Sequence, residues 1–451
     1  DKTYGMFCFA LSIPALFEFF ISFGMGTIVV REVARDRSLT SEYMGNALTL
    51  MVVFSLIAFF VIVALTHILD MTNEMKTAIY LLTLAVVLKQ LNLIFRRFFQ
   101  AYEIFKLETF TTSFERCTLL IVGMAVLFKY GTFLMFCAVF PAVRAISLMV
   151  TLVVVGKHII KPKLTCDIKL CRKLLRNAFP FALISSAYAL YFRIDTIMLS
   201  FMRGDQEVGW YNAAYRLIEG MILLPTIISS VLFPRLSVLS ITSPEMSIAL
   251  FSKGCKVVIA FTAPITILGI TLSDKVIALI YGEQFSNAAI SLKISLLGMG
   301  FMFLSHMFQT MLASINRQNV FIMAMGISIT FNIALNMLMI PKYGFIGASI
   351  STVITAILLF AMTFSYLRKN EFRFNLIRNG AKPVICSIII GGLSFLLMDM
   401  PIALTSIVLV CLYILLLFIL RFWDYRQLLF FFKEAVAMLN AFLSGRQKNA
   451  S

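Results

Sequence analysis

Residues 44–69 read MGNALTLMVVFSLIAFFVIVALTHIL, a run without a single Asp, Glu, Lys or Arg. A helix that crosses the hydrocarbon core of a bilayer needs about 20 consecutive, mainly apolar residues. In hydrocarbon every backbone N–H and C=O must find a partner within the protein, and an α-helix pairs them all within one segment. This run therefore predicts a transmembrane helix.

Runs of this kind recur along the whole chain, which has 451 residues, of which 60% are hydrophobic and 14% charged. Soluble domains average about 45–50% apolar and about 25% charged residues. The composition therefore excludes a soluble enzyme, a soluble nucleic-acid binder and a disulfide-stapled secreted module. We expect an all-α, polytopic membrane protein. Its thirteen predicted spans are 5–30, 44–69, 77–95, 109–128, 132–155, 178–200, 209–233, 257–273, 289–313, 320–340, 346–367, 383–398 and 402–420.

The basic residues between these spans are unevenly distributed over the two sides of the membrane. One set of segments holds 27 Lys and Arg residues, and the alternate set holds six. Because basic loops stay in the cytoplasm, we expect the first set and the C-terminus to be cytoplasmic, in a multi-pass protein of the inner (plasma) membrane. The net charge of +17 then reflects topology and requires no nucleic-acid partner. The basic set comprises 31–43, 96–107, 156–177, 235–256, 314–319, 368–382 and the tail from 421.

The parity of the spans predicts a further helix. Thirteen spans with a cytoplasmic C-terminus place Asp1 on the outer side of the membrane. An N-terminus is rarely exported without a signal. We therefore expect fourteen helices, of which the first precedes Asp1.

A weak internal repeat predicts two parallel halves. Tyr4-Gly5-x-Phe7 opens the first span and Gly209-Trp210-Tyr211 opens the seventh, while Phe99-Gln100-Ala101 and Phe308-Gln309 end corresponding helices. Six spans separate the equivalent motifs, and an even number leaves the halves in the same orientation. The expected organisation is an N-terminal lobe (1–155), a basic linker (156–177), a C-terminal lobe (178–367), two trailing helices (368–422) and an interfacial tail (423–451).

Ionisable side chains at membrane depth mark function by default, because burying a charge there costs about 3 kcal/mol or more. Six of those in the predicted spans are basic and four are acidic, which favours an anionic substrate. Lys293 lies close to a helix end, where its head can reach water. The ten residues are Glu18, Lys89, Glu115, Arg116, Arg144, Arg193, Asp195, Arg216, Glu219 and Lys293.

Helical geometry sorts some of these residues into pairs. Arg216 and Glu219 are three residues apart and share a face, so they either neutralise each other or serve a site together. Arg193 and Asp195 are two residues apart and lie on nearly opposite faces, which prevents a pair. Arg suits an anion with several oxygens because its planar fork binds two of them. The basic residues best placed to contact an anionic substrate are Lys89, Arg144 and Arg193.

Short motifs follow one another along nearly the whole chain. They are Tyr4-Gly5-Met6-Phe7, Arg31-Glu32-Val33-Ala34-Arg35, Arg193-x-Asp195, Val208 through Leu217, Pro234-Arg235-Leu236-Ser237, Tyr281-Gly282, Asn332-x3-Asn336 and Pro341 through Ala348. In this order and spacing the chain resembles the polysaccharide-export flippases of the multidrug/oligosaccharidyl-lipid/polysaccharide superfamily.

The resemblance implies two six-helix lobes around a central cavity, plus two trailing helices. It implies alternating access that flips an undecaprenyl-diphosphate-linked oligosaccharide repeat unit for surface polysaccharide or O-antigen biosynthesis. The implied partners are this substrate, the lipid bilayer, a polysaccharide polymerase and chain-length proteins. We expect Lys89, Arg116, Arg144, Arg193 and Arg216 to bind substrate in the cavity, and Glu18, Glu115, Asp195 and Glu219 to balance charge or couple ions.

Several chemistries have no motif in the sequence. It contains no P-loop, HExxH or paired-cysteine metal motif, so we expect no catalytic residue, metal or cofactor, and no enzyme activity. Two alternatives stay open within the superfamily. A flippase for the peptidoglycan precursor would need the same cationic cavity, and a cation-coupled multidrug exporter would line its cavity with carboxylates and aromatic rings. A glycan polymerase or ligase is disfavoured because the outer loops are short.

Overall fold

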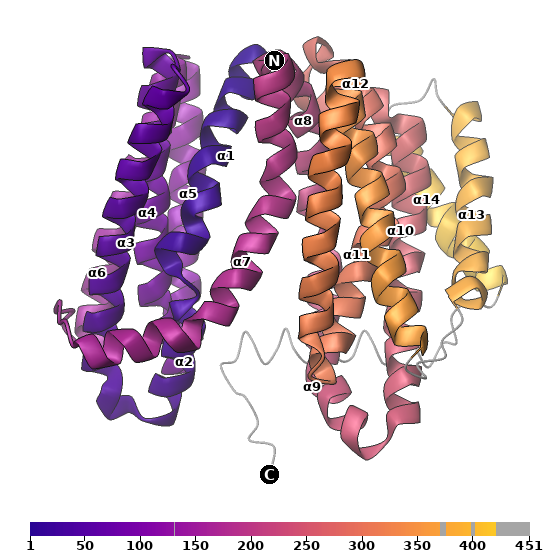
Figure 1. Cartoon of the computed structure of the whole chain (residues 1–451). Coiled ribbons are helices and arrows are strands. Elements are labelled where there is room, and N and C mark those ends of the chain that lie inside the picture. The colour runs from indigo at the N-terminus through magenta and orange to yellow at the C-terminus, as the bar shows by residue number, and fades with distance from the viewer. Residues whose placement is uncertain (130, 370–375, 398–401, 421–451) are drawn as a thin grey trace. The chain divides into compact units, whose positions relative to one another are not determined.

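The computed structural model describes residues 1–129, 131–369, 376–397 and 402–420 (Figure 1). These residues form α-helices and two short 3₁₀ turns, without a strand. The interfacial tail predicted over 423–451 lies outside the described residues. The α-helices are α1 (Lys2–Ser22), α2 (Met25–Arg35), α3 (Thr40–Ile68), α4 (Asn73–Ala101), α5 (Phe105–Lys129), α6 (Phe133–His158), α7 (Ile168–Arg203), α8 (Asp205–Met221), α9 (Leu223–Thr242), α10 (Pro244–Tyr281), α11 (Ala288–Ser314), α12 (Gln318–Lys369), α13 (Leu376–Leu396) and α14 (Ile402–Ile419).

The helices account for the predicted spans. Ten helical stretches in the described part of the chain are long and apolar enough to cross a membrane. One of them, α12, has 52 residues and contains two predicted spans. Two shorter apolar helices, at 380–396 and 404–419, coincide with the last two predictions. The expected fold class, an all-α polytopic membrane protein, is confirmed.

The first predicted span, 5–30, is broken rather than continuous. Phe23 and Gly24 have left-handed φ angles of 45° and 69° and separate α1 from α2. A Cβ on Gly24 would lie 2.7 Å from the Cβ of Phe181, so glycine is required both for the backbone angle and for the close approach of α7. Beyond the break, α2 buries one face, at Met25, Ile28, Val29 and Val33.

The two spans within α12 are antiparallel arms that meet at Gly344, where φ is 57° and ψ is −136°. The side chain of Asn332 donates to the hydroxyl of Thr355 at 3.3 Å from one arm to the other. Figure 1 shows the two arms side by side. The separate spans predicted at 320–340 and 346–367 are thereby confirmed.

The turn at Gly344 is capped by side chains from α7 and α8. Nε of Arg203 donates to the carbonyl of Ile340 at 3.1 Å, at the end of the first arm. The carboxylate of Glu207 accepts the N–H of Phe345 at 2.7 Å, at the start of the second arm. Because helix ends leave carbonyl and N–H groups unpaired, this pair of side chains satisfies both sides of the turn.

Helix α7 begins earlier than expected. The prediction of a loop over 156–177 is wrong from Ile168 onward, because helix α7 runs from Ile168 to Arg203. At about 1.5 Å per residue, such a helix is longer than the roughly 30 Å hydrocarbon core. The part of α7 that is apolar enough to cross a membrane includes Phe181–Arg203, and Figure 1 shows the first turns of α7 lying crosswise to α3–α6 at one end of these helices.

The described chain divides into two compact units, each treated by itself. Residues 6–197 form the N-terminal unit, and residues 1–5 with 198–420 form the C-terminal unit. The division falls within α7, after the predicted linker at 156–177.

Each unit has its own apolar packing. The core of the N-terminal unit is built from α1–α4, α6 and α7 and includes Met44, Phe98 and Phe99. In the C-terminal unit, α13 and α14 pack on α10, where the hydroxyl of Tyr413 donates to the carbonyl of Ala260 at 2.7 Å. The two trailing helices are therefore part of the C-terminal unit.

The turn in α12 yields a testable prediction. Gly344→Ala should lower the free energy of unfolding by about 1–3 kcal/mol, because L residues avoid this backbone region. The new Cβ would also press against the carboxylate of Glu207. Thermal unfolding in detergent measures the effect.

Gly326→Ala in the same helix is the matched control. A Cβ on Gly326 meets nothing within 4 Å, and the change should stabilise the helix by up to about 1 kcal/mol. An unfolding midpoint for Gly344→Ala at or above that of the parent would contradict the requirement for glycine at the turn.

Candidate functional site

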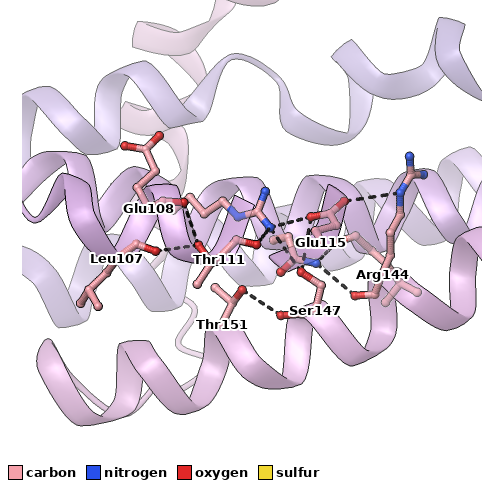
Figure 2. A network of polar contacts seen from close by, with 10 residues as sticks. Leu107, Glu108, Thr111, Glu115, Arg144, Ser147 and Thr151 are labelled. Carbon is pink, nitrogen blue, oxygen red and sulfur yellow. Dashed lines mark hydrogen bonds and ion pairs between the residues drawn. The ribbon is translucent and has the colours of Figure 1, made fainter. Parts of the chain in front are cut away.

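A network of buried polar side chains joins α4, α5 and α6 in the N-terminal unit (Figure 2). Nη2 of Arg96 lies 2.5 Å from the carboxylate of Glu115 and 3.0 Å from the carbonyl of Thr111. The same nitrogen donates to the hydroxyl of Ser147 at 3.3 Å. Arg144 faces the other carboxylate oxygen of Glu115, with its Nε 3.7 Å away. The side chains of Arg96, Glu115 and Arg144 are only 10%, 12% and 13% exposed.

Helical spacing brings these side chains together. Thr111 and Glu115 are four residues apart on α5, and Arg144 and Ser147 are three apart on α6, so each pair shares a face. Arg96 contacts both faces from α4, because a guanidinium carries five N–H donors in a fixed plane. One arginine thus links three helices.

Two arginines share one carboxylate in this network. Nε and Nη1 of Arg144 are buried and have no hydrogen-bond partner in the part of the chain that the structure describes. The guanidinium lies 5.9 Å from the ring centre of Phe140, a cation–π contact. A buried donor left unsatisfied costs about 1–3 kcal/mol. Arg144 therefore presents positive charge and open donors that oxygens of an anion can fill.

A second ion pair joins α1 to α4. Nζ of Lys89 lies 2.7 Å from the carboxylate of Glu18, and the amide of Gln90 donates to the other oxygen at 3.3 Å. The side chains of Lys89 and Glu18 are 41% and 29% exposed. This pair is therefore more accessible than the Arg96–Glu115 pair.

One face of α4 connects the Lys89–Glu18 ion pair with the polar network around Arg96. Lys89, Asn92 and Arg96 recur at spacings of three and four residues, which places them on one face. The amide of Asn92 donates to the backbone carbonyl of Arg144 at 3.1 Å. Together Lys89, Arg96 and Arg144 face two carboxylates, those of Glu18 and Glu115. We name these five residues the cationic cluster; it carries one more positive than negative charge.

The predicted site residues outside this cluster lie in different surroundings. Arg116 is exposed on α5, beside Glu115, whose side chain is 12% exposed. Arg193 and Asp195 lie on α7, where Asp195 is buried and Arg193 is half-buried.

Two predicted basic residues of the C-terminal unit have acidic partners. The Arg216–Glu219 pair exists on α8, with Nη1 of Arg216 3.2 Å from the carboxylate of Glu219. Lys293 lies 2.7 Å from the carboxylate of Asp274, whose side chain is 68% exposed. Lys293 thus combines an accessible position with an ion pair that the sequence analysis did not include.

Arg96 is the residue that the sequence analysis missed. Arg96 lies in the predicted basic loop 96–107, and this prediction is wrong at Arg96 because α4 continues to Ala101 and buries its side chain. The sequence does carry a signal that Arg96 belongs to the helix. Lys89, Asn92 and Arg96 recur at helical spacing, and aromatic residues follow them. Phe98 and Phe99 are fully buried, so apolar packing continues past the charge.

The described chain is thus an all-α, polytopic membrane protein with a net-positive polar cluster inside its N-terminal unit. The chain belongs to the polysaccharide biosynthesis protein family, whose sequence model matches residues 1–240. The resemblance to polysaccharide-export flippases is therefore confirmed at the level of the family.

Three known proteins illustrate the similarity. The "Probable flippase AglR" of Haloferax volcanii is 28% identical over 37% of this chain and 35% of its own length. The "Putative O-antigen transporter" of Shigella flexneri is 23% identical over 79% of this chain and 88% of its own length. The inward-closed structure of the lipid II flippase MurJ superposes with a TM-score of 0.71, covering 95% of this chain and 97% of that one at 18% identity. This likeness shows a shared fold. The chain spans between 35% and 54% of the length of three archaeal relatives.

The shared carboxylate leads to a prediction about stability. Glu115→Gln should lower the free energy of unfolding by about 3–5 kcal/mol, because it leaves two buried guanidinium groups without their counter-charge. Arg144→Gln should lower the free energy of unfolding by less, since Glu115 keeps its ion pair with Arg96. Thermal unfolding in detergent measures the unfolding midpoint of each variant and thus ranks their stabilities.

Arg116→Gln is the control, because it removes an exposed charge from the adjacent position of α5. Such surface changes stay within about 0.5 kcal/mol. If Glu115→Gln unfolds at the same temperature as Arg116→Gln, the structural role of the shared carboxylate is refuted.

Proposed function

We propose that this protein flips an oligosaccharide linked to undecaprenyl diphosphate across the inner membrane, by alternating access, for the assembly of a surface polysaccharide. The observation that carries the proposal is the cationic cluster, in which Arg96 and Arg144 share Glu115. Arg144 keeps buried N–H groups without a partner among the described residues. Such groups fit the oxygens of a diphosphate.

The physical reason is the cost of moving a diphosphate through hydrocarbon. A charged group that leaves water without new partners faces a penalty far larger than any single contact provides. Arginine replaces the lost water with charge-assisted hydrogen bonds in a planar fork. Lys89 adds a more accessible point charge on the same face of α4 as Arg96.

Transport also requires that the substrate's diphosphate leave the cationic cluster again. A cluster of bare cations would hold a diphosphate tightly, whereas Glu18 and Glu115 offset two of its three positive charges. An excess of one charge attracts the anion and keeps its binding weak enough for it to leave. Arg193, Asp195 and the Arg216–Glu219 pair are further candidates for substrate contact and charge balance in this proposal.

The relatives support the same class of cargo. One is named an O-antigen transporter and another a probable flippase. A multidrug exporter for cationic compounds would be expected to place an excess of carboxylates at its site, and the cationic cluster has the opposite balance. A flippase for the peptidoglycan precursor would use the same cations, so only the glycan itself separates that alternative.

The transport role of Arg144 can be tested directly. In a strain that lacks its own polysaccharide flippase, Arg144→Ala should reduce surface glycan by roughly tenfold or more, the equivalent of one lost charge-assisted hydrogen bond. Arg144→Lys should restore only part, because an ammonium cannot fork onto two oxygens. Glycan staining, with the membrane level of each variant checked by blotting, measures the effect.

Lys106→Ala is the matched control, since it removes an exposed cation of α5, in the same unit but outside the cationic cluster. Normal surface glycan from the double variant Lys89→Ala/Arg144→Ala would refute the assigned role of the cluster. Glycan loss that is rescued by a peptidoglycan-precursor flippase would reassign the cargo.

The orientation that the proposal requires is testable with a native residue. Cys166 is exposed in the segment between α6 and α7, which the basic-residue count predicts to be cytoplasmic. A variant with Cys166 as its single cysteine should resist an impermeant thiol reagent in intact cells. A single cysteine introduced at Asp205 should react, and the reverse pattern would invert the topology.

A further inference from the structure

The first turns of α7 carry a set of basic side chains that the cationic cluster does not include. Lys169, Arg172, Lys173 and Arg176 are all exposed, and none forms an ion pair with a described residue. We name these four the basic helix face. It lies at one end of the N-terminal unit, where α7 runs crosswise to the spanning helices (Figure 1).

The opposite face of the same turns is packed into the unit. Cys171, Leu174 and Ala178 are 8%, 1% and 0% exposed, and Leu174 and Ala178 belong to the apolar core. At about 100° per residue, the four basic side chains fall within one sector of about 100° on the other side of the helix. The segment is therefore an amphipathic helix docked on its apolar face.

The start of this helix is held in place by α3. The side chain of Asn46 accepts the N–H of Asp167 at 2.6 Å and donates to the hydroxyl of Thr165 at 3.3 Å. The hydroxyl of Thr49 donates to the carbonyl of Thr165 at 2.8 Å. Asp167 in turn accepts the N–H of Lys169 at 2.8 Å, as a residue that caps a helix start does. The basic helix face thus has a fixed position on the unit.

Apolar side chains border the basic helix face and remain uncovered. Ile168 is 79% exposed and Phe179 is 52% exposed, and both lie beside Arg172 on the helical projection. Leu164, in the segment before the helix, is 67% exposed. Exposed apolar and basic side chains side by side are typical of a helix that lies in the membrane interface, with rings and branches in the acyl region and cations at the phosphates.

We propose that the basic helix face is a binding surface for the phosphate groups of anionic phospholipids. The position of the basic helix face fits this role, because the first turns of α7 lie at the end of helices that are long enough to span the hydrocarbon core. The positive charge of the basic helix face also fits this role, because anionic lipids attract basic segments beside a membrane. The uncovered Ile168 and Phe179 favour a lipid surface over a soluble polyanion, since only lipid covers them. Binding would hold the base of α7, which continues as one helix to Arg203.

The test uses the purified full chain in detergent, titrated with phosphatidylglycerol or phosphatidylcholine and followed by native mass spectrometry. The parent should retain phosphatidylglycerol in preference to phosphatidylcholine. Each basic residue near the surface contributes about fivefold, so Arg172→Gln/Lys173→Gln/Arg176→Gln should weaken phosphatidylglycerol binding by roughly a hundredfold. Arg172→Lys/Arg176→Lys should keep it, because the charges remain.

Lys2→Gln/Lys129→Gln/Lys342→Gln is the matched control. It removes three exposed charges from the segments of the sparsely basic set, and it should bind phosphatidylglycerol like the parent. Equal loss in both triple variants would overturn the proposal in favour of a general charge effect, and no loss in either would overturn it outright. Farnesyl diphosphate should not displace phosphatidylglycerol from the parent. Displacement would overturn the proposal by assigning the surface to the diphosphate of a transported lipid.

Discussion

Hydrocarbon contains no water, so each polar group at membrane depth must be paired within the protein or by a ligand. Helical hydrogen bonds meet this demand along most of the chain. Where the helix is interrupted, side chains take over: Arg203 and Glu207 pair the carbonyl and N–H groups that the turn at Gly344 leaves open. The same demand applies to the buried Nε and Nη1 of Arg144, for which no described residue provides a hydrogen-bond acceptor.

In the cationic cluster, one carboxylate has a structural role and, under the proposed function, a role in balancing charge. Glu115 ties α5 to α4 through Arg96 and faces Arg144 on α6. A cluster without acidic residues would repel itself and hold an anion too firmly, while a fully neutralised one would attract none. An excess of a single positive charge lies between these limits. Under the proposed function, this excess lets a lobe of packed helices remain stable while it keeps an affinity for the anionic substrate.

The helical spans could be predicted from the sequence because the hydropathy of a segment is a sum over neighbouring residues. A segment with a high sum is stable in the hydrocarbon core. The ends of the helices could not. Helix α4 continues past its apolar run to Ala101, and α7 begins at Ile168 rather than near 178. Caps and tertiary packing decide such ends, as Asn46 and Asp167 do at the start of α7. The break at Gly24 depends on the approach of another helix, which no local pattern reports.

The sequence by itself determined that the chain spans a membrane many times, that its buried charges favour cations, and that Lys89 and Arg144 have no acidic residue nearby on their own helices. Only the tertiary structure decided their partners: Glu18 for Lys89, from 71 residues away, and Glu115 for both Arg144 and Arg96. The number of charges is a property of composition, which the sequence states outright. An ion pair depends on which faces of distant helices meet, and that is decided by how the apolar sides of those helices pack together.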